Sequence, residues 1–180
     1  MKLQNLITTF FILLSIFSAF CQEEEKINAI RSTVDQINSF SEYDVIQLLN
    51  DYYVDTKNEV ADNGQELKGY YKNGQLKKMV YSIGISCCMN TYEYYFADDS
   101  LIFVYEKQDI YKAVSDSDGE FIGWDYAKFE PEFEGRYYFE NKLIIFQETF
   151  GNKMFDNNSN KQVMFFRDIK EHLQDLKKVE

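Results

Sequence analysis

Three segments of this chain repeat one pattern: an aromatic pair, a polar turn and then an aliphatic stretch. They span residues 70–76, 94–101 and 137–143. Asn73-Gly74 in the first segment suits the positive φ angles of a type I′ turn, which makes it a strong hairpin signal. Glu140-Asn141 has the same offset in the third segment, whereas the second has one extra residue and is expected to carry a longer or bulged loop. The chain is therefore expected to form β-hairpins.

Further along the chain, residues 111–124 predict a fourth hairpin that turns at Asp118-Gly119. Pro131, the only proline, predicts a strand start or a sheet edge, since proline lacks the backbone donor of a central strand. Residues 43–54 are ambiguous, because residues 45–49 fit a short helix and residues 52–54 fit a strand. The uneven spacing of the repeated segments argues against a solenoid.

Helices are expected at both ends of the sheet. Apolar residues recur at helical spacing in an N-terminal group and in a C-terminal group. These residues are Ile27, Ile30, Val34 and Ile37 in the first group, and Phe166, Ile169, Leu173 and Leu176 in the second. The sequence therefore predicts one α+β domain over residues 22–180, an antiparallel β-meander of about six to nine strands flanked by an N-terminal and a C-terminal helix.

The first repeated segment, Gly69-Tyr70-Tyr71-Lys72-Asn73-Gly74-Gln75-Leu76, resembles the hairpins of MORN-type repeat proteins. The resemblance covers the three short segments, and the regular glycines of such arrays are missing elsewhere. This resemblance implies β-hairpins and does not indicate a function. More broadly, the chain resembles small exported Bacteroidota proteins of unknown role, in which the mature chain often begins at a glutamine such as Gln22.

The N-terminus predicts export. Lys2 gives a basic start, residues 6–20 form an apolar run, and Ala19 to Cys21 form a cleavage site, so residues 1–21 are expected to be a signal peptide. The run is shorter than the roughly 20 residues of a membrane span. A lipid anchor at Cys21 is the less favoured alternative, because Phe20 stands where a lipobox has a small residue. The expected location is periplasmic or extracellular.

The formal net charge of −11 at pH 7 argues against two classes of partner. An acidic chain is repelled by nucleic acid and by anionic lipid surfaces, so neither nucleic-acid binding nor stable membrane insertion after signal removal is expected. Cys87 and Cys88 are adjacent, and adjacent strand residues point to opposite faces. We therefore favour two separate thiols over a strained vicinal disulfide, while their redox state stays open.

Candidate catalytic and metal-binding residues are sparse. Glu130, Glu132 and Glu134 alternate along a predicted strand, and a hydrolase would use Glu132 and Glu134 as its carboxylate pair. A solvated strand edge is the favoured interpretation. Neither of two acidic segments matches a calcium-binding loop. The segment at Asp116 lacks the carboxylate required at the first ligand position, and the segment at Asp156 lacks the glycine required at the turn. His172, the only histidine, is expected to be exposed, and no metal or cofactor is predicted.

Tyrosines are the candidate binding residues. If the hairpins lie side by side, Tyr71, Tyr95 and Tyr138 form a ladder on one face of the sheet, and the other tyrosine of each pair lies on the opposite face. With both helices on one face, the bare face would bind a protein, peptide or glycan, with Trp124 as an addition. The register could equally expose the other three tyrosines, and simple cross-strand stabilisation is the competing explanation.

The expected function is that of an exported, non-catalytic binding protein. Two alternatives remain, a hydrolase that uses carboxylates and an acidic inhibitor of a cationic secreted protein. The identity of the ligand and the oligomeric state stay open.

Overall fold

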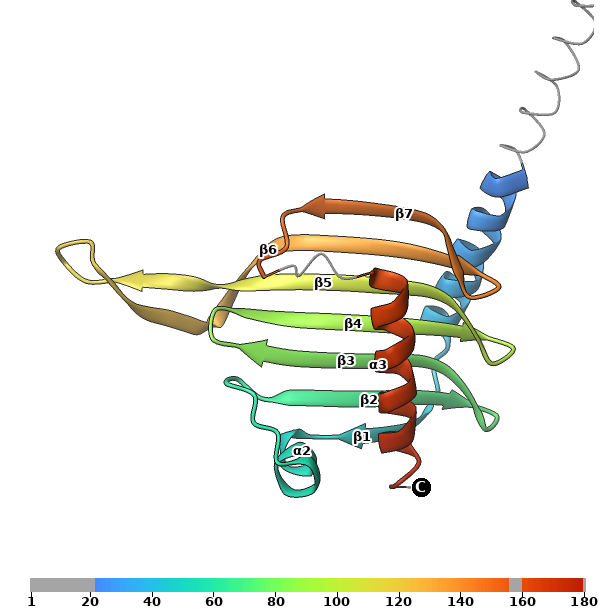
Figure 1. Cartoon of the computed structure of the whole chain (residues 1–180), viewed down its shortest axis with the longest axis horizontal. Coiled ribbons are helices and arrows are strands. Elements are labelled where there is room, and N and C mark those ends of the chain that lie inside the picture. The colour runs from blue at the N-terminus through green and yellow to red at the C-terminus, as the bar shows by residue number, and fades with distance from the viewer. Residues whose placement is uncertain (1–21, 156–159, 180) are drawn as a thin grey trace, which may run out of the picture.

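The computed structural model describes residues 22–155 and 160–179 of the chain. The predicted signal peptide and most of the segment that begins at Asp156 lie outside the described residues. Seven antiparallel strands form one sheet in which each strand is hydrogen-bonded to its neighbours in the sequence, in the order β1-β2-β3-β4-β5-β6-β7 (Figure 1). The predicted α+β meander with flanking helices is confirmed.

The seven strands differ widely in length. They are β1 (Asp44–Leu48), β2 (Gln65–Lys72), β3 (Gln75–Ile85), β4 (Cys88–Ala97), β5 (Ser100–Ser115), β6 (Phe121–Glu140) and β7 (Leu143–Gly151). The helices are α1 (22–39), α2 (Asn50–Lys57) and α3 (Lys161–Leu176). In Figure 1, α3 crosses the front of the sheet, α1 lies behind it, and α2 lies beside β1.

The two long helices cover opposite faces of the sheet, so the expectation that both cover one face is wrong. On the α3 face, Phe165 of α3 is fully buried against Tyr94, Tyr137 and Phe139. On the α1 face, Ile27 and Ile37 of α1 are buried against strand residues. Those strand residues are Tyr95, Phe103 and Tyr138. The helical stripes read from the sequence are confirmed, and each forms its own core because the sheet presents apolar side chains on both faces.

The three repeated hairpins share one geometry. Each turns through two residues with φ between 47° and 73°, namely Asn73-Gly74, Asp98-Asp99 and Asn141-Lys142. Each also has a bulge that leaves one residue of the second strand without a partner, three positions after the turn; these residues are Lys77, Ile102 and Ile145. The expected bulge in the second copy is therefore present in all three, although its loop has only two residues.

Residues 43–54 form a strand followed by the start of a helix, which reverses the helix-then-strand order that the sequence suggested. Val45 and Ile46 belong to edge strand β1 and pair with Tyr70 and Gly69 of β2. The following residues form α2, in which Tyr53 is buried in the α3-face core. Burial of this aromatic ring against the sheet outweighs the strand preference of consecutive tyrosines, because tertiary packing overrides local propensity.

Beyond the end of β7, strand β6 has one neighbour only. The last β6–β7 pair joins Phe133 to Gly151, so Pro131 pairs with β5 alone and lies beside a register shift. Proline is tolerated there because no second strand needs its backbone donor. Gly151 has a φ of 77°, and a Cβ at this position would collide with the Glu132 carbonyl. The expectation of an edge at Pro131 is met, although the proline lies inside β6.

Replacing Phe165 with alanine tests the core under α3. We expect Phe165→Ala to lower the free energy of unfolding by about 3–5 kcal/mol, because it leaves a cavity among three rings. Phe121→Ala is the matched control, since Phe121 lies on the surface, and should change stability by less than about 1 kcal/mol. Urea unfolding followed by circular dichroism measures both. Equal stabilities of the two variants would contradict this packing.

Candidate functional site

Two of the tyrosines predicted to form an exposed platform are buried. Tyr95 and Tyr138 are each 2% exposed, because α1 covers their face of the sheet. The Tyr138 hydroxyl accepts a hydrogen bond from Arg31 Nε of α1 at 3.1 Å, and the Tyr95 hydroxyl bonds to Asn38 of α1 and to Glu93. Burial raises the pKa of Tyr95. The expected bare platform is therefore absent at these two positions.

Tyr71 lies on the opposite face from Tyr95 and Tyr138. Both Tyr71 and Leu176 of α3 lie directly over Gly69, which places Tyr71 on the α3 face. The true counterpart of Tyr95 and Tyr138 is Tyr70, which precedes its turn by the same three residues. Its ring meets the Tyr43 ring edge to face, with 5.6 Å between ring centroids. Alignment by tyrosine pairs is therefore one residue out of register, because the middle and last copies carry an extra phenylalanine before the turn.

Trp124, the fourth predicted residue, lies in a two-stranded arm that extends past the rest of the sheet (Figure 1). The pairing of β4 with β5 ends at Ile110, and that of β7 with β6 begins at Phe133. Residues 111–132 therefore have strand partners only within β5 and β6, and we call them the arm. The fourth hairpin predicted from the sequence is confirmed as the outer part of this arm.

The base of the arm is fixed by aromatic packing. Tyr111 is buried there between Tyr126 and Phe129, whose ring centroids lie 4.9 and 5.2 Å from its own. The register jumps from Tyr111↔Phe129 to Lys112↔Asp125, so residues 126–128 bulge out of β6. Asp125 closes this bulge by accepting a hydrogen bond from the Ala127 amide at 3.1 Å. The bulge therefore interrupts the β5–β6 pairing at the base of the arm.

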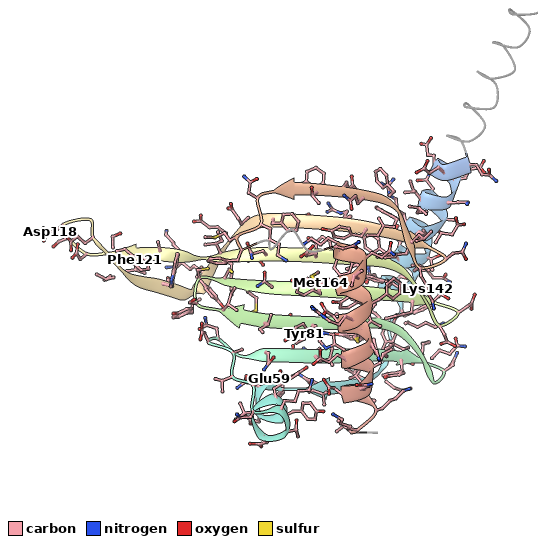
Figure 2. All side chains as sticks on the ribbon, in the orientation of Figure 1. Glu59, Tyr81, Asp118, Phe121, Lys142 and Met164 are labelled. Atoms are coloured by element: carbon pink, nitrogen blue, oxygen red, sulfur yellow. The ribbon has the colours of Figure 1, made fainter. Side chains whose placement is uncertain are left out.

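The outer arm carries exposed apolar side chains. Phe121 is 57% exposed and Ile122 is 64% exposed, and the Phe121 ring packs on Trp124 with 5.0 Å between centroids. Figure 2 shows Phe121 and Asp118 at the far end of the molecule. Tyr126 and Phe129 at the base are half exposed as well. Exposed large apolar residues gathered on one projection, and flanked by polar groups, are typical of an interaction site.

The arm is also acidic. Residues 111–132 contain six carboxylates and two lysines. At the tip, Asp116 Oδ1 accepts hydrogen bonds from the backbone amides of Asp118 and Glu120, each at 2.9 Å. This is an ordinary turn stabilised by its own carboxylate. The apolar side chains of the arm therefore lie among negative charges.

A second concave feature lies beside α1 on the face that holds Tyr95 and Tyr138. It is a cavity of about 410 Å³ with Arg31 on one wall and Arg136 on another. Most of its charged groups are already engaged. Glu93 pairs with Lys78 at 2.8 Å, Arg136 pairs with Glu134 at 2.8 Å, and Arg136 lies over the Tyr105 ring. Arg31 of α1 pairs with Glu148 of β7 at 3.7 Å, so part of the polar lining holds α1 on the sheet.

A buried ionic cluster fastens the segment after β7 to the sheet. Glu106 of β5 is fully buried and binds Lys153 and Lys161, while the Tyr137 hydroxyl donates to it at 2.8 Å. Next to it, buried Gln108 accepts a hydrogen bond from the Met154 amide at 2.7 Å. Buried charges persist only when they are paired and hydrogen-bonded, and this carboxylate meets both conditions. Its partners give it a structural role.

The two cysteines do not point to opposite faces as expected. Cys87 lies in the two-residue turn between β3 and β4, and Cys88 begins β4. Both are buried free thiols whose sulfur atoms lie 3.5 Å apart. Burial raises the pKa of Cys88 to about 12, so the thiol is a poor nucleophile at neutral pH.

The carboxylates suggested for a hydrolase are at the surface. Glu132 is exposed at the base of the arm, and Glu134 forms an ion pair with Arg136 at 2.8 Å. The register shift at Pro131 also breaks the alternation that would place Glu130 on the same face. Within residues 22–155 and 160–179, no group of three or more metal-binding side chains comes together, and no helix has both the length and the apolar character of a membrane span.

Comparisons of this chain with protein-family models, with curated proteins and with solved structures found no match.

His172 is buried, which corrects the expectation of an exposed side chain. This residue of α3 is 7% exposed, and its ring centroid lies 4.3 Å from that of Tyr81. Neither ring nitrogen has a hydrogen-bond partner within the described residues. Burial lowers the pKa of His172 to about 4; nearby Glu171 and Asp175 act in the opposite direction and Lys57 in the same one. The ring is therefore neutral at pH 7.

This burial predicts a loss of stability in acid. A histidine in the unfolded chain has a pKa near 6.5. The contribution of buried His172 to the free energy of unfolding is therefore complete above that pH and is lost as the pH falls toward 4. We expect His172→Gln to remove at most roughly 3 kcal/mol of this dependence. Urea unfolding at several pH values between 4 and 7.5 measures it. Parallel stability curves for the variant and the unmodified protein would show that His172 does not couple folding to pH.

Proposed function

We propose that this is an exported, non-catalytic binding protein and that the arm is its docking surface. The observation that carries the proposal is the projection of exposed Phe121 and Ile122 beyond the sheet, together with half-buried Trp124. Their arm stands on a base packed around Tyr111. Aromatic side chains supply large contact areas with little loss of conformational freedom, and interface hot spots are rich in them. The predicted signal peptide supports the assignment to the periplasm or the exterior.

Charge favours one class of partner. The six carboxylates of the arm would oppose an anionic membrane or a nucleic acid, whereas they would attract a basic protein surface. We therefore propose a partner with an apolar pocket bordered by lysine or arginine. This agrees with the earlier alternative of an acidic inhibitor of a cationic secreted protein.

The test compares capture of native-host envelope and secreted proteins by three forms of the tagged protein. The first form is unmodified, and the second carries Phe121→Ser, Ile122→Ser and Trp124→Ser. The matched control carries Leu49→Ser, Val60→Ser and Val163→Ser, which replace three exposed apolar residues outside the arm. We expect one basic protein to be retained by the unmodified and control forms and lost by the arm variant.

Binding to the purified partner should also depend on salt. Raising the salt from about 50 to about 300 mM should weaken the affinity at least several-fold, because exposed charges are screened over roughly 10 Å or less. Titration calorimetry measures the change. Equal capture by the arm variant, or preferential binding of the unmodified protein to anionic vesicles, would overturn the proposal. A folded arm variant, verified by circular dichroism, makes either outcome decisive.

A further inference from the structure

A groove lies at the end of the molecule opposite the arm. It has a volume of about 760 Å³ and runs between α3 and the turns that join β4 to β5 and β6 to β7. Figure 2 shows Lys142 at this end and Asp118 at the other. A volume of several hundred Å³ is typical of small-molecule sites. The groove is therefore spatially separate from the proposed docking surface.

The lining of the groove is largely apolar. Phe96, Leu101 and Phe139 come from the sheet, and Phe166, Ile169 and Leu173 come from α3. The Phe139 and Phe166 rings meet edge to face with 5.8 Å between centroids. Phe166 and Leu173 are only partly buried, so the helix leaves apolar surface in contact with solvent here. Such surface favours an alkyl chain over a polar ligand.

Two lysines stand at the rim of this groove. Lys142 comes from the β6–β7 turn and Lys170 from α3, and both are exposed. Neither forms an ion pair with any residue that the structure describes. Of the two carboxylates that also line the groove, Glu140 is paired with Lys26 at 2.7 Å and Asp99 lies in the β4–β5 turn. The rim therefore offers positive charge on a chain whose net charge is −11.

We propose that this groove binds a single-chain amphipathic anion. Its alkyl chain would lie along Phe139, Phe166 and Ile169, and its carboxylate, sulfate or phosphate head would lie between Lys142 and Lys170. The apolar lining supplies affinity through burial, and the lysines select the sign of the head group. This site is independent of the arm and of the proposed partner protein.

The direct test is calorimetric titration of the purified protein with dodecanoate below its micelle concentration. We expect one-to-one binding with a Kd below about 100 µM. Shortening the chain to decanoate and octanoate should weaken binding by roughly fourfold for each methylene lost. Dodecyltrimethylammonium, which has the same chain and the opposite charge, should bind at least about tenfold more weakly.

Paired variants locate the site. Lys142→Asn with Lys170→Gln should weaken dodecanoate binding at least about tenfold, since asparagine tolerates the φ of 66° at position 142. Lys112→Asn with Lys177→Gln removes two lysines outside the groove and should leave the affinity unchanged. The triple arm variant should also bind normally, which separates this proposal from the proposed function.

Three results would overturn the proposal: no saturable dodecanoate binding, equal binding by the groove double variant, or equal affinity for the cationic amphiphile. Co-sedimentation with phosphatidylglycerol vesicles distinguishes a free ligand from a lipid surface. Binding to vesicles without binding of free dodecanoate would indicate surface adsorption and contradict a groove ligand. The lysine substitutions lie on the surface, so circular dichroism should verify that both double variants are folded.

Discussion

The strict alternation of side chains across a sheet that is covered on both faces is the constraint on which the structure depends. Each repeated hairpin combines a two-residue turn with one unpaired residue, and this combination decides which aromatic ring faces α1 and which faces α3. Tyr95 and Tyr138 consequently bury under α1, while Phe96 and Phe139 bury under α3. A shift of one residue would exchange the two cores.

A sheet with both faces covered has little central surface left for recognition. The surfaces that remain lie at its ends, where strands run past their neighbours or where a helix leaves part of the sheet uncovered. The arm is of the first kind, since β5 and β6 continue beyond β4 and β7. The groove is of the second kind, since α3 borders it on one side only. The same packing that buries the tyrosines therefore accounts for both proposed sites.

Features that depend on a few adjacent residues were predictable from the sequence. Asn73-Gly74 identified a hairpin because its φ angles are a local property, and the apolar spacing of α1 and α3 identified their buried stripes. The face of Tyr71 was not predictable, because it depends on the register of a partner strand. His172 was missed for a similar reason, since its burial follows from rings on β3 and β4 that approach only in the folded chain.

Of the proposed docking surface, the sequence identified Trp124 and the turn at Asp118-Gly119. It did not show that this hairpin projects, because projection depends on where β4 and β7 end. The structure shows why it projects, since β5 (Ser100–Ser115) and β6 (Phe121–Glu140) are longer than the other strands. The groove carries no local signal, since two turns and a helix distant in the sequence create it.

Photocrosslinking in the native host can show whether the arm, and not the covered sheet, meets the partner. A photoreactive phenylalanine analogue would replace Trp124 in the arm or, in a second form, Val60, which is exposed outside it. We expect a discrete crosslinked species with a basic protein from position 124 and none from position 60. Crosslinking from position 60 alone, or no crosslink from position 124 in a folded and exported protein, would show that the arm is not the docking surface.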